Sequence, residues 1–239
     1  MIETNINKES SSIASMFDGI AHSYDKVNHI LSFNIDKRWR KRLIKYLPKK
    51  HSIKILDVAT GTGDLAIMMA KNCKGAKIRA IDISENMLEI AKEKAYKAKV
   101  DDKILFQKAN VESLPFDDNT FEYCTISFGI RNFENINKSL TEIYRCLKPG
   151  GKLFILEFGN KPTSKFVQFF YKIYSKIWIP FIGGIISHNT SAYKYLPVSI
   201  SEFVHRRELS RQLKHIGFGA VNYKKLTNGI VIFYEGVKL

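Results

Sequence analysis

The stretch that decides the fold is Ile55-Leu56-Asp57-Val58-Ala59-Thr60-Gly61-Thr62-Gly63-Asp64. It begins as an apolar run typical of a buried strand, continues through a loop with two glycines, and ends where a helix is expected to begin. Glycines let a loop turn sharply and approach a ligand closely, and the first turn of a helix presents backbone amides without partners. The stretch therefore predicts a strand, a ligand-binding loop and a helix in succession.

A second acid, Asp82, follows the next apolar run, about 20 residues after the loop, which is the spacing of a ribose-binding acid. The tips of neighbouring parallel strands lie side by side in a doubly wound sheet, so we expect Asp82 beside the glycines. Residues 61–66 also fit the glycine pattern of dinucleotide-binding domains, so an NAD-dependent enzyme stays open at this point. The simpler alternative is a tight turn without a ligand, and the acid placed to meet a ribose argues against it.

Apolar runs alternate with amphipathic stretches from residue 53 onward. We expect strands over residues 53–58, 77–81, 104–108, 123–127 and 152–157, with a helix after the N-cap candidate Ser84 and another before the fifth strand, ended by Lys148-Pro149-Gly150-Gly151. Residues 220–226 and 230–237 flank the turn signal Asn228-Gly229 and predict a hairpin that makes the edge of the sheet antiparallel. The expected fold is α/β and Rossmann-like, with a mostly parallel seven-stranded sheet, an antiparallel C-terminal hairpin strand and helices on both faces.

The length of 239 residues fits one domain, and we expect residues 1–239 to form it. Two parts lie outside the alternation. Residues 1–50 predict a helical N-terminal cap, and residues 160–206 form an aromatic insertion whose Gly183-Gly184 pair fits the hinge of a substrate lid.

Composition narrows the location and the partners. The three cysteines form no CxxC pair and have no histidine at zinc-ligand spacing, so neither a disulfide framework nor a metal site is expected. The first twelve residues lack a secretory signal and no apolar run is long enough to span a membrane, so the sequence predicts a cytoplasmic protein. The formal charge of +15 would attract phosphate-rich partners or an anionic membrane, although the lysines are spread along the chain.

Asp57 before Ala-Thr-Gly-Thr-Gly, together with the Leu-Lys-Pro-Gly-Gly turn before the fifth strand, resembles the class I methyltransferases that use S-adenosylmethionine. The usual pattern has glycine where Ala59 stands, and alanine is nearly as small. The terminal hairpin fits this class and is not expected of an NAD domain. The resemblance implies that Gly61, Thr62 and Gly63 line the methionine part of the cofactor and that Asp82 contacts its ribose hydroxyls.

Motifs over nearly the whole chain resemble one family, the ubiquinone and menaquinone biosynthesis C-methyltransferases. They include Met16-Phe17-Asp18, Tyr24-Asp25, Leu31-Ser32-Phe33, Ala109-Asn110-Val111-Glu112, Ser127-Phe128-Gly129-Ile130-Arg131-Asn132, Leu156-Glu157-Phe158 and Tyr193-Lys194-Tyr195-Leu196. The resemblance implies that S-adenosylmethionine is contacted by Thr62, Asp82, Asn110, Val111 and Ser127. All five follow one of the first four strands, where ligands bind in open α/β sheets.

The resemblance also implies the reaction, in which a ring carbon of a prenylated quinol attacks the sulfonium methyl. The protein must hold the two reactants in line and exclude water, and no metal is required. Demethylmenaquinol is the favoured substrate, with the benzoquinol of the ubiquinone pathway as the alternative. Arg131, just past the fourth strand, is the catalytic candidate because a cation there would stabilise a developing phenolate; a structural salt bridge is its alternative role.

Two other functions remain to be weighed. The positive charge fits a nucleic-acid methyltransferase, but Ser-Phe-Gly-Ile stands where amine-methylating enzymes carry Asn/Asp-Pro-Pro-aromatic, and no cysteine follows a proline, so no nucleic-acid partner is expected. A catalytically silent binding module would not need the complete set of Asp57, Gly61, Gly63 and Asp82. The basic and aromatic segments predict peripheral, salt-sensitive contact with a membrane surface. The sequence sets neither the tail length of the quinol nor the oligomeric state.

Overall fold

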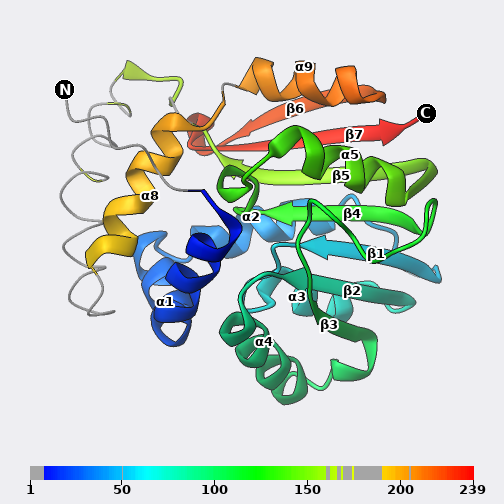
Figure 1. The fold of residues 1–239 in the computed structure, drawn as a ribbon, viewed down its shortest axis with the longest axis horizontal. Coiled ribbons are helices and arrows are strands. Elements are labelled where there is room, and N and C mark those ends of the chain that lie inside the picture. The colour runs from blue at the N-terminus through cyan, green and yellow to red at the C-terminus, as the bar shows by residue number, and fades with distance from the viewer. Residues whose placement is uncertain are drawn as a thin grey trace.

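The computed structural model describes residues 8–49, 51–159, 162–165, 168, 174, 190–204 and 206–239. Within them lies a seven-stranded sheet of order β3-β2-β1-β4-β5-β7-β6 (Figure 1). The strands are β1 (Ile53–Val58), β2 (Ala76–Asp82), β3 (Ile104–Lys108), β4 (Phe121–Ser127), β5 (Leu147–Phe158), β6 (Phe218–Leu226) and β7 (Val231–Lys238). The strand order reverses between β1 and β4, which is the point where open α/β sheets bind their ligands.

Strands β1 to β5 pair in parallel, and β7 pairs antiparallel with both β5 and β6. The predicted parallel sheet and C-terminal hairpin are therefore confirmed. The edge differs from expectation: β6 is the edge strand and runs in the direction of β1 to β5, because the second hairpin strand, β7, inserts between β5 and β6. The turn between them places Asn228 and Gly229 at φ values of 58° and 85°, the left-handed region that this pair favours.

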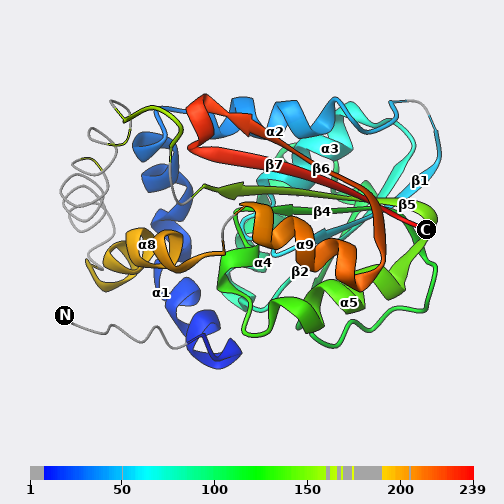
Figure 2. The ribbon, with the colours of Figure 1, turned by 90° about the horizontal axis from the view of Figure 1, so that it is seen from above.

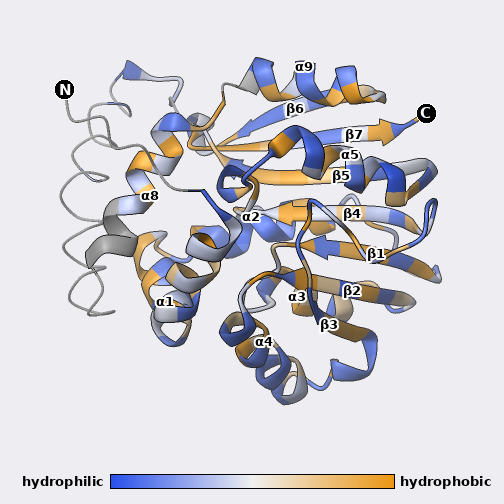
Figure 3. Cartoon of the chain, in the orientation of Figure 1, coloured by the Kyte–Doolittle hydropathy of each residue, from blue (hydrophilic) through white to orange (hydrophobic). Residues whose placement is uncertain are grey.

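Helices cover both faces of the sheet. The helices in the described part of the chain are α1 (Ser10–Leu31), α2 (Ile35–Ile44), α3 (Asp64–Asn72), α4 (Glu85–Lys97), α5 (Ile136–Cys146), α8 (Thr190–Glu202) and α9 (Arg206–Ile216), of which α1 and α8 lie beyond one end of the sheet (Figure 1). Figure 2 shows α2 and α3 on one face and α5 and α9 on the other. Trp39 and Leu43 pack with Phe154 in one core, and Ile143 and Leu209 belong to the second. Figure 3 shows the central strands β1 and β5 as mostly apolar, whereas the edge strand β6 is largely hydrophilic.

Local signals in the sequence explain most element boundaries. Ser84 caps α4 by accepting a hydrogen bond from the Met87 amide at 3.2 Å, as predicted. The fifth strand begins earlier than predicted, because α5 ends at Cys146 and β5 starts at Leu147. The Lys148-Pro149-Gly150-Gly151 turn thus lies inside β5, where the register against β4 shifts.

The N-terminal helices lie where they can cover a ligand. Helix α1 is beyond the carboxyl ends of β1 to β5, and α2 returns along one face of the sheet (Figures 1 and 2). Of the predicted lid over residues 160–206, the segment up to residue 189 lies almost entirely outside the described residues, and α8 occupies residues 190–202. Among the described helices, none combines the length and apolarity needed to cross a bilayer.

Candidate active site

A cavity opens at the carboxyl ends of the central strands, underneath α1. Its walls come from the segments that follow β1, β2, β3 and β4, and from Ser10, Ile13, Phe17 and Tyr24 of α1. The space between these walls, including the open solvent at the mouth, is about 970 Å³. The fold thus brings together residues from Ser10 to Glu134 at the switch point of the sheet.

The two glycines of the loop after β1 have different tasks. Gly61 lines the cavity at φ +56°, and a Cβ atom placed there would meet nothing within 4 Å, so this position leaves room for a ligand. Gly63 is not among the described residues that line the cavity. A Cβ atom at Gly63 would lie 3.0 Å from the Ala91 Cβ and 3.3 Å from the Phe106 ring, so this glycine lets α3 begin close to α4.

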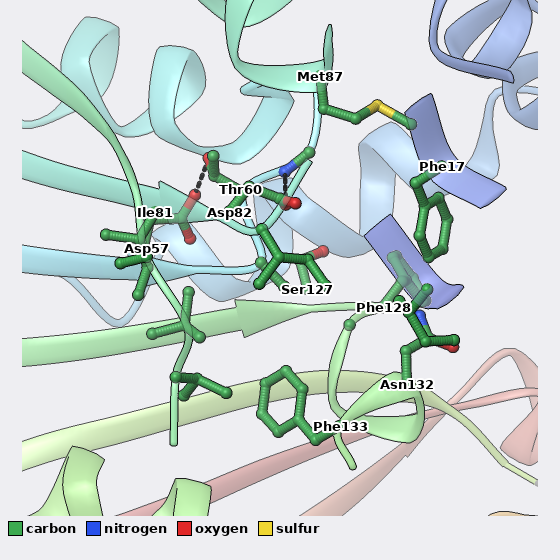
Figure 4. A pocket seen from close by; sticks show the side chains of 18 of the residues that line it. Phe17, Asp57, Thr60, Ile81, Asp82, Met87, Ser127, Phe128, Asn132 and Phe133 are labelled. Atoms are coloured by element: carbon green, nitrogen blue, oxygen red, sulfur yellow. Dashed lines mark hydrogen bonds between the residues drawn. The ribbon is translucent and has the colours of Figure 1, made fainter. Parts of the chain in front are cut away.

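Asp82 lies beside the loop, at the tip of β2 (Figure 4). Its carboxylate accepts the Gly61 amide at 2.8 Å and the Ser84 amide at 3.0 Å, one on each oxygen. Burial raises the pKa of this carboxyl above its ordinary value. Since a carboxylate offers about four acceptor positions, each oxygen keeps one for a further donor such as a hydroxyl.

Asp57 supports the loop from below. It is buried at the tip of β1 and accepts hydrogen bonds from the hydroxyls of Thr60 at 2.7 Å and Thr125 at 2.5 Å. Burial is the main cause that raises the pKa of Asp57 to about 6. The side chain therefore ties the loop to β4, and it also lines the cavity.

Ser127, Val111 and Asn110 complete the predicted cofactor set, and all three line the cavity. The Ser127 Oγ is buried and has no hydrogen-bond partner within the described chain, so a bound ligand with a polar group would satisfy it. Asn110 is exposed, accepts the Glu112 amide at 2.9 Å and donates to the Ser10 Oγ at 3.1 Å. The open space at Gly61 and the unsatisfied Ser127 hydroxyl both fit a polar cofactor.

Thr62 makes contacts that the sequence did not predict. Its hydroxyl donates to Asp25 of α1 at 2.5 Å, and the Lys94 ammonium group lies 3.2 Å from the same hydroxyl. Lys94 also pairs with Asp25 at 2.5 Å and with Asp64 at 2.6 Å. The Thr62 side chain thus fastens α1 and α4 to the glycine loop, and Thr62 also lines the cavity.

Arg131 lies behind the cavity wall and is not among the described residues that line it. Its guanidinium group is buried, pairs with the equally buried Glu157 at 2.9 Å and donates to the Phe128 carbonyl oxygen. It also stacks over the Phe158 ring at 5.5 Å. Glu157 belongs to the Leu156-Glu157-Phe158 motif, but nothing in the sequence indicated that it pairs with Arg131.

The Arg131 charge still influences the cavity. Burial raises the pKa of Tyr24, which lines the cavity, and the positive charges of Arg131 and then Arg40 oppose that rise.

A second group of charges, His29, Asp36 and Asp64, has ligand atoms close enough together for a metal ion. Arg40 already lies 2.5 Å from Asp36 and 3.9 Å from Asp64, so this side chain supplies the positive charge there.

Ala59 shows why glycine is usual at its position. Its φ of +52° lies in the left-handed region, which costs an alanine about 1–2 kcal/mol. Across the cavity wall, a Cβ atom on Gly129 would lie 2.5 Å from the Ala59 Cβ. Gly129 itself has an ordinary φ of −113°, so only this contact demands a glycine there. There is therefore room for a methyl group at position 59 or at position 129, but not at both.

We expect Gly129→Ala to lower the free energy of unfolding by about 1–3 kcal/mol, because it overpacks this contact. The same change in an Ala59→Gly background should cost less than about 0.5 kcal/mol, since the opposing methyl is gone. Urea unfolding of the parent, both single variants and the double variant gives the coupling between the two sites. An equal cost of Gly129→Ala in both backgrounds would contradict this account.

The fold and the site together define a class. A doubly wound sheet with an antiparallel strand inserted near one edge, a glycine loop after β1 and an acid at the tip of β2 is the architecture of class I methyltransferases. An S-adenosylmethionine-dependent methyltransferase of Thermotoga maritima superposes with a TM-score of 0.67 at 18% identity, covering 94% of this chain and 99% of that one. The [4+2]-cyclase SpnF superposes with a TM-score of 0.71 at 14% identity, covering 96% of each chain. Since a cyclase shares the fold, the fold alone does not set the reaction.

Sequence comparison is more specific. The ubiE/COQ5 methyltransferase family matches residues 4–238, and the chain belongs to this family. The demethylmenaquinone methyltransferase of Bacteroides fragilis is 41% identical over 235 residues, which cover 98% of this chain and 96% of that protein. The ubiquinone/menaquinone biosynthesis C-methyltransferase UbiE of Rickettsia bellii is 43% identical over 237 residues, 98% and 95% of the two chains. The protein is therefore a methyltransferase, and S-adenosylmethionine is its methyl donor.

Proposed function

We propose that the protein methylates a ring carbon of a prenylated quinol, with demethylmenaquinol as its substrate. The observation that carries this proposal is the division of the cavity into two kinds of wall. Asp82 and Ser127 provide polar groups on one side, and the rings of Phe17, Phe128 and Phe133 line the other side together with the side chain of Asn132 (Figure 4). A polar cofactor and a flat aromatic ring suit these two walls, and the names of the relatives from Bacteroides and Rickettsia support a quinone pathway.

S-adenosylmethionine supplies, when bound, a methyl group on a positively charged sulfur. The new carbon–carbon bond forms from the ring electrons as the sulfur–carbon bond breaks, its electron pair stays on sulfur, and the ring then loses a proton. The chain's own task is positioning: Asp82 and the amide-bearing loop hold the polar side, and the aromatic residues hold the ring. Helix α1 covers the cavity and limits the entry of water, which favours reaction between groups already in contact.

We assign Arg131 two contributions to the reaction, a positioning one through Phe128 and an electrostatic one through its charge, and neither needs contact with the substrate. It holds the Phe128 carbonyl, and Phe128 is kept in the left-handed region at φ +62° in the wall that faces the ring. From behind that wall, the positive charge of Arg131 stabilises negative charge that develops on the quinol oxygen.

A substrate with an isoprenoid tail resides in a bilayer. We therefore propose that the protein is cytoplasmic and makes reversible contact with the membrane surface.

The test is methyl transfer from labelled S-adenosylmethionine to two quinols, demethylmenaquinol and the demethylated benzoquinol, each dispersed in detergent. We expect label in the naphthoquinol ring, with a kcat/KM at least about tenfold higher than for the benzoquinol, because the larger ring buries more area against the aromatic wall. Label in the benzoquinol alone would assign the protein to ubiquinone synthesis. Absence of label in both, with cofactor binding intact, would refute quinol methylation.

A further inference from the structure

The outer face of α2 is uniformly basic. Exposed positive side chains occur at Lys37, Arg38, Lys41 and Arg42 and continue with Lys45 directly after the helix. The opposite face is buried through Trp39 and Leu43. The helix has one acidic residue, Asp36, which is buried and paired with Arg40, so it does not offset the charge of the outer face.

Two apolar side chains are exposed next to this basic face. Phe33, in the turn between α1 and α2, is 77% exposed, and Ile30 in the last turn of α1 is 42% exposed. Phe33 also adopts φ +50°, a conformation that is rare and strained for a bulky residue. Asparagine or glycine would be more stable there, so neither packing nor backbone preference explains a phenylalanine. Strain at an exposed position with no structural benefit is a reason to look for a function.

We infer that the α1–α2 corner, defined as Ile30, Phe33 and the exposed basic side chains of residues 37–45, docks the protein on an anionic lipid bilayer. The basic side chains contact lipid headgroups, and Phe33 inserts between them into the apolar layer, as amphipathic membrane-surface elements do. The inference rests on the proposed function, because a tailed quinol is found in the bilayer. A nucleic acid would also attract the charge, but it offers no apolar layer for Ile30 and Phe33.

The position of the corner relative to the cavity supports docking. Helices α1 and α2 form the corner with their outer sides, and the same helices reach the cavity wall with Tyr24 and Arg40. Figure 2 shows α2 following directly on the C-terminal end of α1. A bilayer at the corner would therefore lie about one helix diameter, roughly 10 Å, from the cavity wall. Docking there brings the cavity to the surface that holds the substrate.

The sharpest test is Phe33→Asn. Asparagine tolerates the left-handed conformation, so the variant should unfold at the same temperature as the parent or a higher one. It should bind vesicles of phosphatidylglycerol and phosphatidylcholine about tenfold more weakly in a sedimentation assay at low salt, because the inserting ring is lost. Parental vesicle binding by a correctly folded Phe33→Asn variant would overturn the insertion of Phe33.

A charge-matched pair of triple variants tests the basic face. Lys37→Gln/Arg38→Gln/Lys41→Gln should lower vesicle binding about 100-fold at low salt, since each basic residue near an anionic surface contributes about fivefold. Lys71→Gln/Lys77→Gln/Lys214→Gln removes the same charge from exposed positions on α3, β2 and α9 and should lower binding less than about threefold. High salt should abolish the difference. Equal losses in the two triple variants would mean that net charge alone drives binding and would overturn the proposed surface.

Two further measurements separate the inference from the proposed function. All variants should methylate a short-tailed quinol in solution, without vesicles, at the parental rate, because the corner lies outside the cavity. The vesicle-binding assay does not depend on methyl transfer. If the parent fails to methylate quinols, the proposed function is refuted, and the vesicle-binding result still tests the docking surface. Binding to a DNA duplex, measured in parallel, should not depend on Phe33. A parent that binds the duplex but no anionic vesicles would overturn docking to a bilayer.

Discussion

Replacing Arg131 by methionine should lower the free energy of unfolding by about 3–5 kcal/mol, because it leaves the Glu157 carboxylate buried without its counter-charge. Glu157 is fully buried and is otherwise reached by main-chain amides, among them that of Phe158 at 2.8 Å. Sequence reasoning alone predicts instead a variant that keeps its fold and loses about 10²- to 10³-fold in rate. The structure makes loss of stability the first effect to measure, by urea unfolding.

A double variant separates stability from turnover. Arg131→Met/Glu157→Leu replaces the ion pair by apolar side chains, a change that is often neutral for buried pairs. We expect it to recover most of the lost stability and to remain about 10²-fold slower than the parent in kcat, with cofactor affinity unchanged. The net charge of the pair is the same, but the guanidinium group that acts on cavity-lining Tyr24 and holds the Phe128 carbonyl is gone. Arg131→Lys should recover part of the rate, since it keeps the charge without the planar fork.

The outcome decides between two roles for Arg131. A stable double variant with parental kcat would mean that Arg131 only fills a structural ion pair. A slow double variant whose rate is partly restored in Arg131→Lys would assign the charge itself to the reaction. A loss of S-adenosylmethionine binding in either variant would place the effect on the cofactor side and contradict the proposed role.

The strands were the most predictable part of the fold. Strands β1 and β3 have the predicted bounds, because each is a short apolar run between clear turn signals. The hairpin was also evident from Asn228-Gly229. The position of β7 inside the sheet was not, because strand order depends on which neighbours pair in space, and periodicity reports only which face of a strand is buried.

The site was predictable where it follows from topology and unpredictable where it depends on long-range contacts. Asp82 and Gly61 meet because the tips of β1 and β2 are neighbours, which the sheet guarantees. The bond from Thr62 to Asp25 and the pairing of Arg131 with Glu157 join residues 37 and 26 positions apart on different elements. No spacing rule links such pairs, so the sequence assigned Thr62 to the cofactor and Arg131 to the substrate without their partners. The sequence did not distinguish Gly63 from Gly61 for the same reason, since the close packing of Gly63 against Ala91 and Phe106 is a long-range contact.

The second large effect is expected at Asp82. Asp82→Ala should weaken S-adenosylmethionine binding by about 1.5–3 kcal/mol, because it removes the charged acceptor for the ribose hydroxyls together with the group that fixes the Gly61 amide. Asp82→Asn should weaken S-adenosylmethionine binding at least as much as Asp82→Ala. Both carboxylate oxygens face amide donors, Gly61 and Ser84, so either orientation of the new side chain points its NH₂ group at an N–H.

Titration calorimetry with S-adenosylmethionine measures the affinities, and urea unfolding shows whether the loop has lost stability. Glu85→Gln is the matched control, because it removes one negative charge from an exposed side chain that pairs with Lys108 near the same strand tip but outside the cavity.

In the parent, burial raises the pKa of Asp82, so its carboxyl takes up a proton at higher pH than an exposed aspartate. Cofactor affinity should therefore fall as the pH is lowered toward that raised pKa, and the part of this dependence that comes from Asp82 should be lost in Asp82→Ala. Any part that comes from Asp57, whose pKa burial raises to about 6, should remain in both proteins. Parental affinity in Asp82→Ala, or an identical pH profile in both proteins, would show that the ribose is held by another group.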